Sequence, residues 1–151
     1  MRRTQFSKSV RETRRIAEEF ALGLLRKETR ATVVGLIGEL GAGKTLFVQR
    51  AARALGVRRR MPSPTFLIAR AYPLSRRSSF KKLYHLDAYR IKNRQDLDSI
   101  DFFRILESSR TVVLIEWADR IRKYLPKDAY IIRIEHGKNY HERNIKLPSM
   151  K

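Results

Sequence analysis

The sequence contains no cysteine, few acidic residues and no long hydrophobic run. The missing thiols exclude disulfides, thiolate metal sites and cysteine nucleophiles, and they give no support for secretion. The longest apolar run, from Ala31 to Ile37, is too short to span a bilayer. The basic stretch from Met1 to Arg15 lacks the apolar core of a signal peptide. We therefore expect a soluble, cytoplasmic protein without a membrane partner.

The charge balance is the most unusual property of the composition. Among 151 residues, 34 Lys and Arg face 15 Asp and Glu, which gives a formal net charge of +19. Such a surplus predicts a polyanion as a neighbour. The length and the 42% hydrophobic content suit a single domain, residues 1–151, whose ends at 1–6 and 148–151 we expect to be loose.

Hydrophobic periodicity predicts a helix, a strand and a second helix in the first part of the chain. Ser9 begins a capping-box pattern, and apolar residues recur at helical spacing to about Lys27. The continuous apolar run Thr32–Ile37 predicts a strand that is covered on both faces. Residues Lys44–Leu55 predict a helix, which Gly56 ends.

The rest of the chain mixes strands with short helices. The runs Phe66–Leu74 and Lys81–Leu86 flank a polar segment and predict an antiparallel hairpin. The apolar run Thr111–Ile115 predicts a second buried strand, in the centre of the sheet. We further predict a helix from Asn93 through Leu106, a short helix over Asp119–Leu125, and closing strands over Tyr130–Glu135 and Arg143–Leu147.

Residues Gly38 to Thr45, GELGAGKT, match the P-loop pattern. Gly38 and Gly43 can adopt backbone angles closed to other residues, so that successive amide groups turn inward at a helix N-terminus. Lys44 is then placed to reach the β- and γ-phosphates, and the Thr45 hydroxyl to coordinate Mg²⁺. The alternative is a glycine-rich turn with a surface lysine, but the strand before the motif and the helix after it favour a nucleotide.

A carboxylate follows the second buried strand, at Glu116. A charge at that point emerges at the C-terminal edge of a parallel sheet, beside the P-loop, where open α/β sheets bind their ligands. Glu116 is therefore a candidate for the magnesium site. The alternative is the first exposed residue after a buried strand, and the pattern alone does not separate the two.

A second cluster of polar residues ends the predicted hairpin. Strand alternation places His85, Asp87 and Tyr89 on one face, where Asp87 is suited to hold a metal-bound or attacking water and Arg90 to offset phosphate charge. The alternative is an ordinary polar strand end. Thr65, in a turn sequence, either senses the γ-phosphate or merely begins a strand.

These segments together resemble the TsaE family, formerly YjeE. The resemblance rests on their order: GELGAGKT from Gly38, SPTF from Ser63, HLDAYR from His85 and LIEW from Leu114. It implies a small P-loop ATPase for threonylcarbamoyl modification of adenosine 37 in tRNAs that read ANN codons. Such a protein acts with TsaD-like and TsaB-like partners, and its ATP hydrolysis alone is weak.

The resemblance also implies roles for individual residues, with ATP or ADP and Mg²⁺ as cofactors. Thr45 and Glu116 fall on metal-binding positions, and Asp87, Glu116 and Lys44 on catalytic ones. Trp117 falls on an aromatic position beside the site. Glu39 is a departure, since typical members carry Asp there. The implied nucleotide-binding residues are Glu39, Leu40, Gly41, Ala42, Gly43, Lys44, Thr45, Leu46 and Thr65.

The fold we predict is a three-layer α/β P-loop NTPase domain with a mixed, partly parallel sheet and a β-hairpin insertion. Its parallel core includes the strands that end at Ile37 and Ile115. Two other functions compete with the ATPase. A small-molecule kinase on a P-loop fold needs a lid helix where the hairpin is predicted, which disfavours it. A nucleotide-independent RNA-binding module makes the positive charge itself the function.

The basic residues gather in short runs outside the predicted core. They contact either tRNA phosphates or an acidic partner surface, or they form a solvated surface without a specific role. Since no aromatic platform accompanies them, we predict no sequence-specific reading of RNA. The runs are Arg58–Arg60, Arg76–Arg77, Lys81–Lys82 and Arg120–Lys123.

Overall fold

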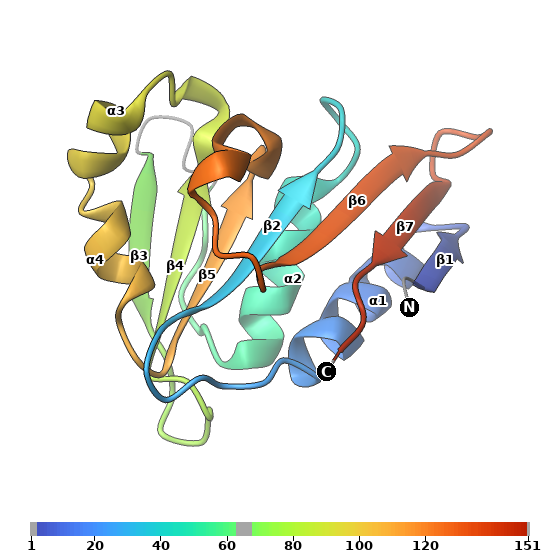
Figure 1. Cartoon of the computed structure of the whole chain (residues 1–151). Helices are drawn as coiled ribbons and strands as arrows, with labels where there is room; N and C mark the ends of the chain where they lie inside the picture. Colours follow the sequence, from blue (N-terminus) through green and yellow to red (C-terminus); the bar gives the residue numbers. More distant parts are fainter. Residues whose placement is uncertain (1–2, 63–67, 151) are drawn as a thin grey trace.

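A computed structural model describes residues 3–62 and 68–150 of the chain. They form a seven-stranded sheet with helices on both faces (Figure 1). No helix within them is long and apolar enough to cross a membrane. The elements are β1 (Arg3–Ser7), α1 (Val10–Leu22), β2 (Thr32–Ile37), α2 (Lys44–Leu55), β3 (Ala69–Pro73), β4 (Lys82–Asp87), η1 (Ala88–Arg90), α3 (Arg94–Asp98), α4 (Phe102–Leu106), β5 (Thr111–Glu116), η2 (Ala118–Tyr124), β6 (Tyr130–His136) and β7 (Arg143–Leu147).

The sheet has a parallel centre and antiparallel edges, in the order β1-β7-β6-β2-β5-β4-β3. Strand β2 pairs in parallel with β5 and with β6, and β5 pairs in parallel with β4. Every residue of β2 and β5 is buried, as expected for strands covered on both faces. The hairpin β3–β4 and the closing pair β6–β7 are antiparallel. The predicted mixed sheet is confirmed, as is the central place of β5.

Two helical layers enclose this sheet. Helices α1 and α2 lie side by side on one face (Figure 1), where Leu36 and Phe47 are fully buried. Helices α3 and α4 and the 3-10 segment η2 cover the other face, over Phe102, Ile115 and Ile121. The predicted three-layer α/β architecture is therefore confirmed.

Two predicted helices begin at the expected residues, but one is shorter than predicted and the other is divided in two. Ser9 caps α1, since its Oγ accepts from the Glu12 amide at 3.1 Å, but the helix ends at Leu22 rather than near Lys27. Gly23 is the C-cap, and the chain turns there toward β2. The predicted helix from Asn93 is two short helices, α3 and α4. Asp101 separates them in a left-handed conformation (φ 55°), which Asp tolerates better than most residues.

The expectation of a loose N-terminus is wrong for residues 3–6. They belong to β1, which pairs antiparallel with β7 in the register Gln5↔Ile145. The strand continues to Ser7, which is buried and whose Oγ lies 2.8 Å from Thr13 Oγ1 of α1. This strand is held by backbone pairing at the sheet edge and not by a buried apolar face. Its mostly polar sequence therefore lacks the apolar alternation by which a strand is predicted.

Candidate functional site

The loop between β2 and α2 has the backbone geometry of a phosphate-binding turn. Gly41 and Gly43 adopt left-handed conformations, with φ of 75° and 104°, which L side chains rarely adopt. Gly38, expected to need such an angle, does not have one. A side chain there is excluded for another reason: a Cβ at Gly38 would lie 2.5 Å from the Ile134 carbonyl oxygen.

The first turn of α2 presents backbone donors beside this loop. The first four amide groups of a helix have no partner within the helix. Gly43 is the N-cap of α2 and makes no side-chain capping bond to them. With the helix dipole, these donors form a site for an anion at the start of α2.

Lys44 is folded back over the loop. Its Nζ donates to the carbonyl oxygens of Gly38 at 2.6 Å and Glu39 at 2.8 Å, and it lies 3.9 Å from the centre of the Trp117 ring. Burial lowers the pKa of this ammonium group, although the nearby carboxylates, Glu116 first among them, oppose the shift. The side chain thus places a desolvated positive charge against the anion site.

Glu116 joins three elements at the C-terminal edge of the sheet. Thr45 Oγ1 donates to Glu116 Oε1 at 2.5 Å, and His85 Nε2 lies 2.6 Å from Glu116 Oε2. Glu116 is 3% exposed and His85 is fully buried. The parallel register sets Glu116 opposite Leu36 of β2 and opposite Asp87 of β4, so the three strands end together at this point.

Lys44, Thr45 and Glu116 border a cavity of about 440 Å³. Asp87 is at its rim, and its Oδ1 accepts from the Tyr89 amide at 3.0 Å. The rings of Tyr89 and Trp117 contact one another at a tilt of 55°, with their centres 5.0 Å apart, and Trp117 has a left-handed backbone (φ 56°). The lining consists of Leu40, Gly41, Gly43, Lys44, Thr45, Asp87, Tyr89, Glu116 and Trp117.

The donor set suits a magnesium ion that is shared with phosphates. Within the described residues, no group of three or more His, Asp or Glu side chains is placed to hold a metal ion. Mg²⁺ usually binds proteins through one or two oxygen ligands and keeps water or phosphate oxygens for the rest of its shell. The Thr45 hydroxyl and the Glu116 carboxylate, already in contact, fit that requirement.

The remaining predicted nucleotide-binding residues lie in different places. Leu40 is 85% exposed at the tip of the loop, and Ala42 is buried beneath it. Glu39 borders a neighbouring cavity of about 540 Å³, next to Trp117. Leu46 lines a different cavity, on the outer side of α2. Thr65 lies outside the described residues.

The sequence did not predict two sets of contacts at the site, and the first is made by Arg143. This residue of β7 donates from Nε to the Ala42 carbonyl oxygen at 2.8 Å and from Nη2 to that of Gly41 at 3.1 Å. It also bonds the Tyr140 and Glu142 carbonyl oxygens. Arg143 therefore ties the P-loop to the far end of the chain. The other missed contact is the pairing of His85 with Glu116.

Removing the Arg143 side chain is expected to loosen the loop. An Arg143→Ala protein should weaken ADP binding about tenfold and lose about 1.5–3 kcal/mol of unfolding free energy, because two loop carbonyls lose a charged donor. Calorimetric ADP titration and urea denaturation measure these effects. Lys146→Ala is the control: it lies on the same strand as Arg143, removes an exposed ion pair with Glu135 of β6, and should cost less than about 1 kcal/mol. If the two variants show the same ADP affinity and the same unfolding free energy, Arg143 does not stabilise the P-loop.

Comparison with known proteins gives one family. The model for the family described as Threonylcarbamoyl adenosine biosynthesis protein TsaE matches residues 7–145. A similar protein from Bacillus subtilis (strain 168), named tRNA threonylcarbamoyladenosine biosynthesis protein TsaE, is 38% identical over 106 residues, which cover 70% of this chain and 62% of that protein. A Haemophilus influenzae protein of the same name is 30% identical over 137 residues, which cover 88% and 80%. The crystal structure of Bacillus subtilis YdiB is similar over all of this chain and 87% of that one, with a TM-score of 0.73 and 28% identity.

Proposed function

Since the chain belongs to the family of threonylcarbamoyl adenosine biosynthesis proteins TsaE, we propose that it is a magnesium-dependent ATPase that serves the threonylcarbamoyl modification of tRNA. The contact between Thr45 and Glu116 beside the P-loop carries the proposal. A P-loop that has no carboxylate near its Ser or Thr hydroxyl can bind an anion but lacks a protein ligand for the accompanying metal ion. With that carboxylate in place, the same loop has the ligands for Mg²⁺ and for a triphosphate.

The proposed roles follow from the positions of the side chains. The loop amides and Lys44 would bind the phosphates, and Thr45 and Glu116 would hold a magnesium ion, which would supply positive charge to offset that of the phosphates. Asp87, at the rim of the same cavity, orients the attacking water. His85 fixes the Glu116 carboxylate from the buried side. Because an ionised carboxylate only accepts hydrogen bonds, His85 then donates from Nε2.

The partners belong to the same proposal. We propose that the chain acts with TsaD-like and TsaB-like proteins, and that its hydrolysis of ATP is weak until they assemble. The exposed Leu40 and Tyr89 at the mouth of the cavity support this, because both are apolar or aromatic side chains left open to contact beside the nucleotide.

The observed hairpin argues against the kinase alternative. Strands β3 and β4 occupy the region in which a small-molecule kinase would carry an arginine-bearing lid helix. The RNA-binding alternative concerns a different surface of the protein. The nucleotide proposal does not depend on whether that surface binds RNA.

Calorimetric titration of ADP and GDP, each with and without Mg²⁺, tests the proposal. We expect ADP to bind, and a triphosphate analogue to bind more tightly with Mg²⁺ than without it. A purified TsaD-like partner should then be retained on the immobilised chain in the presence of ATP. If neither ADP nor GDP binds under any of these conditions, the nucleotide proposal is wrong.

A further inference from the structure

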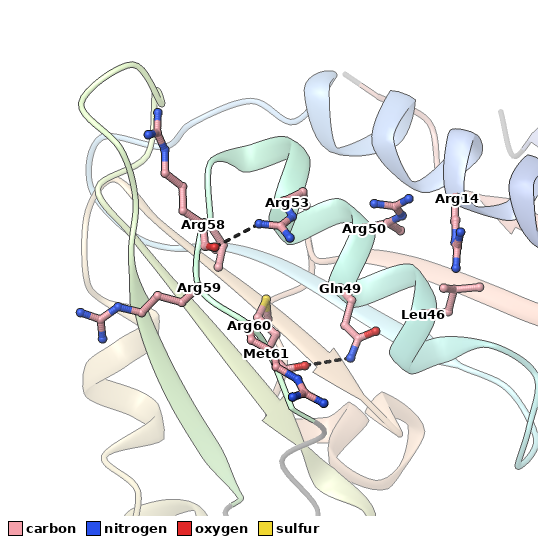
Figure 2. Close-up of a pocket in the computed structure, with 10 residues that line it drawn as sticks. Arg14, Leu46, Gln49, Arg50, Arg53, Arg58, Arg59, Arg60 and Met61 are labelled. Atoms are coloured by element: carbon pink, nitrogen blue, oxygen red, sulfur yellow. Dashed lines mark hydrogen bonds between the residues drawn. The ribbon is translucent and has the colours of Figure 1, made fainter.

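The cavity that Leu46 lines has a volume of about 710 Å³ and lies between α1, the outer side of α2 and the segment that follows α2. Figure 2 shows Arg58, Arg59 and Arg60 projecting in different directions from that segment, while Arg14 reaches toward the same surface from α1. We call this the arginine cavity. Its basic lining consists of Arg14, Arg50, Arg53, Arg58, Arg59 and Arg60.

The backbone under these side chains is fixed in place. Gln49 Nε2 of α2 donates to the Met61 carbonyl oxygen at 2.8 Å, and Arg53 Nη1 donates to that of Arg58 at 3.1 Å (Figure 2). Val57 and Met61 are both buried against the core. Two buried anchors and two side-chain bonds thus hold the segment, so that the three consecutive arginines between the anchors face solvent.

The arginine cavity brings six arginines together with almost no acidic counter-charge, that is, with few carboxylate oxygens within 4.0 Å of a guanidinium group. Among the described residues that line the arginine cavity, only Arg50 has such a contact, to Glu18 at 3.8 Å, and none of the lining residues is acidic. Like charges held together without counter-charge destabilise a folded protein. An external polyanion would supply the missing charge.

We propose that the arginine cavity binds the phosphodiester backbone of RNA. Among its described lining residues there is no aromatic side chain on which a base would stack, so the contact is to phosphates rather than to bases. An acidic protein surface fits less well, because protein interfaces have a core enriched in aromatic and apolar groups, and here only Leu46 adds partly exposed apolar surface. Guanidinium groups bind phosphate in a bidentate manner, which suits six arginines on one surface.

That the RNA is a tRNA rests on the proposed function. Helix α2 carries both sites: Lys44 and Thr45 face the nucleotide cavity, and Leu46, Gln49, Arg50 and Arg53 line the arginine cavity. The described linings of the two cavities share no residue, so RNA and nucleotide would not compete for the same side chains.

The test measures binding of an unmodified tRNA transcript that reads an ANN codon. Fluorescence anisotropy gives the affinity at each concentration of a salt series. The variant carries Arg58→Gln, Arg59→Gln and Arg60→Gln, three exposed side chains. We expect about 10- to 100-fold weaker binding and a salt slope reduced by about three, one for each lost phosphate contact. A second variant, Arg14→Gln with Arg59→Gln, should lower the slope by about two.

The control removes the same charge from the opposite face of the sheet. It carries Arg104→Gln, Arg122→Gln and Lys123→Gln, which are exposed on α4 and η2. If the cavity variants and this control bind tRNA within about twofold of one another, the inference is overturned. That result is the one expected if the cavity binds an acidic protein and not RNA. ADP titration of the same proteins separates the two proposals, because loss of RNA binding with intact ADP binding leaves the nucleotide site standing.

Discussion

A Lys44→Ala protein is expected to lose ADP binding by at least about 100-fold, or about 2.8 kcal/mol. The ammonium group lies at the start of α2, held by the carbonyl oxygens of Gly38 and Glu39, in the place from which it would meet phosphate. No other cationic side chain lines the described nucleotide cavity. Calorimetric titration of ADP measures the loss. Since burial of this charge is itself unfavourable, the fold should survive its removal.

The pH dependence gives a second measurement on the same residue. Burial lowers the pKa of Lys44 below 10.5, and only the ammonium form attracts phosphate. ADP affinity should therefore be complete below the lowered pKa and decline as the pH rises through it, whereas Lys44→Ala should show no such decline. Lys123→Ala, an exposed lysine on η2, is the control and should behave as the unaltered protein does. Wild-type affinity in Lys44→Ala would refute the phosphate-binding role.

The sequence predicted those parts of the fold in which local pattern and tertiary burial agree. The apolar runs of β2 and β5 combine a local preference with a buried place in the core. The Ser9 cap of α1 and the Gly56 stop of α2 bound helices whose inner faces are buried in that core. Strand β1 escaped prediction because its polar residues are held by pairing with β7, which lies at the other end of the chain. The break at Asp101 escaped because the helical spacing of apolar residues continues across it.

The candidate site divides in the same way. The P-loop and Glu116 were predicted because each has a local signal, a glycine pattern in one case and a charge at the end of a buried strand in the other. The carboxylate partner of His85 and the bonds from Arg143 to the loop had no such signal. They join residues from different strands, and only the order of strands in the sheet brings them together.

A Glu116→Gln protein is expected to lose ATP hydrolysis in the partner complex by at least about 100-fold, while ADP binding without Mg²⁺ changes by less than about threefold. Glutamine keeps the side-chain size and one oxygen for the buried His85, whereas alanine would leave that imidazole without its partner at a cost of about 1–3 kcal/mol. The neutral amide is a poor magnesium ligand. Titration of a triphosphate analogue with and without Mg²⁺ should therefore show that the ion no longer strengthens binding.

Asp87→Asn separates the proposed metal-binding role of Glu116 from the proposed water-orienting role of Asp87. Asp87 borders the same cavity, but the Thr45 hydroxyl donates to Glu116 and not to Asp87, so this protein should keep the magnesium effect on nucleotide binding and still lose turnover. Glu135→Gln, which removes a partly exposed carboxylate on β6, should change neither quantity. If Glu116→Gln keeps its response to Mg²⁺ and hydrolyses ATP at the wild-type rate, the carboxylate is not a metal ligand. Its bond to Thr45 would then serve only to position the start of α2 against the sheet.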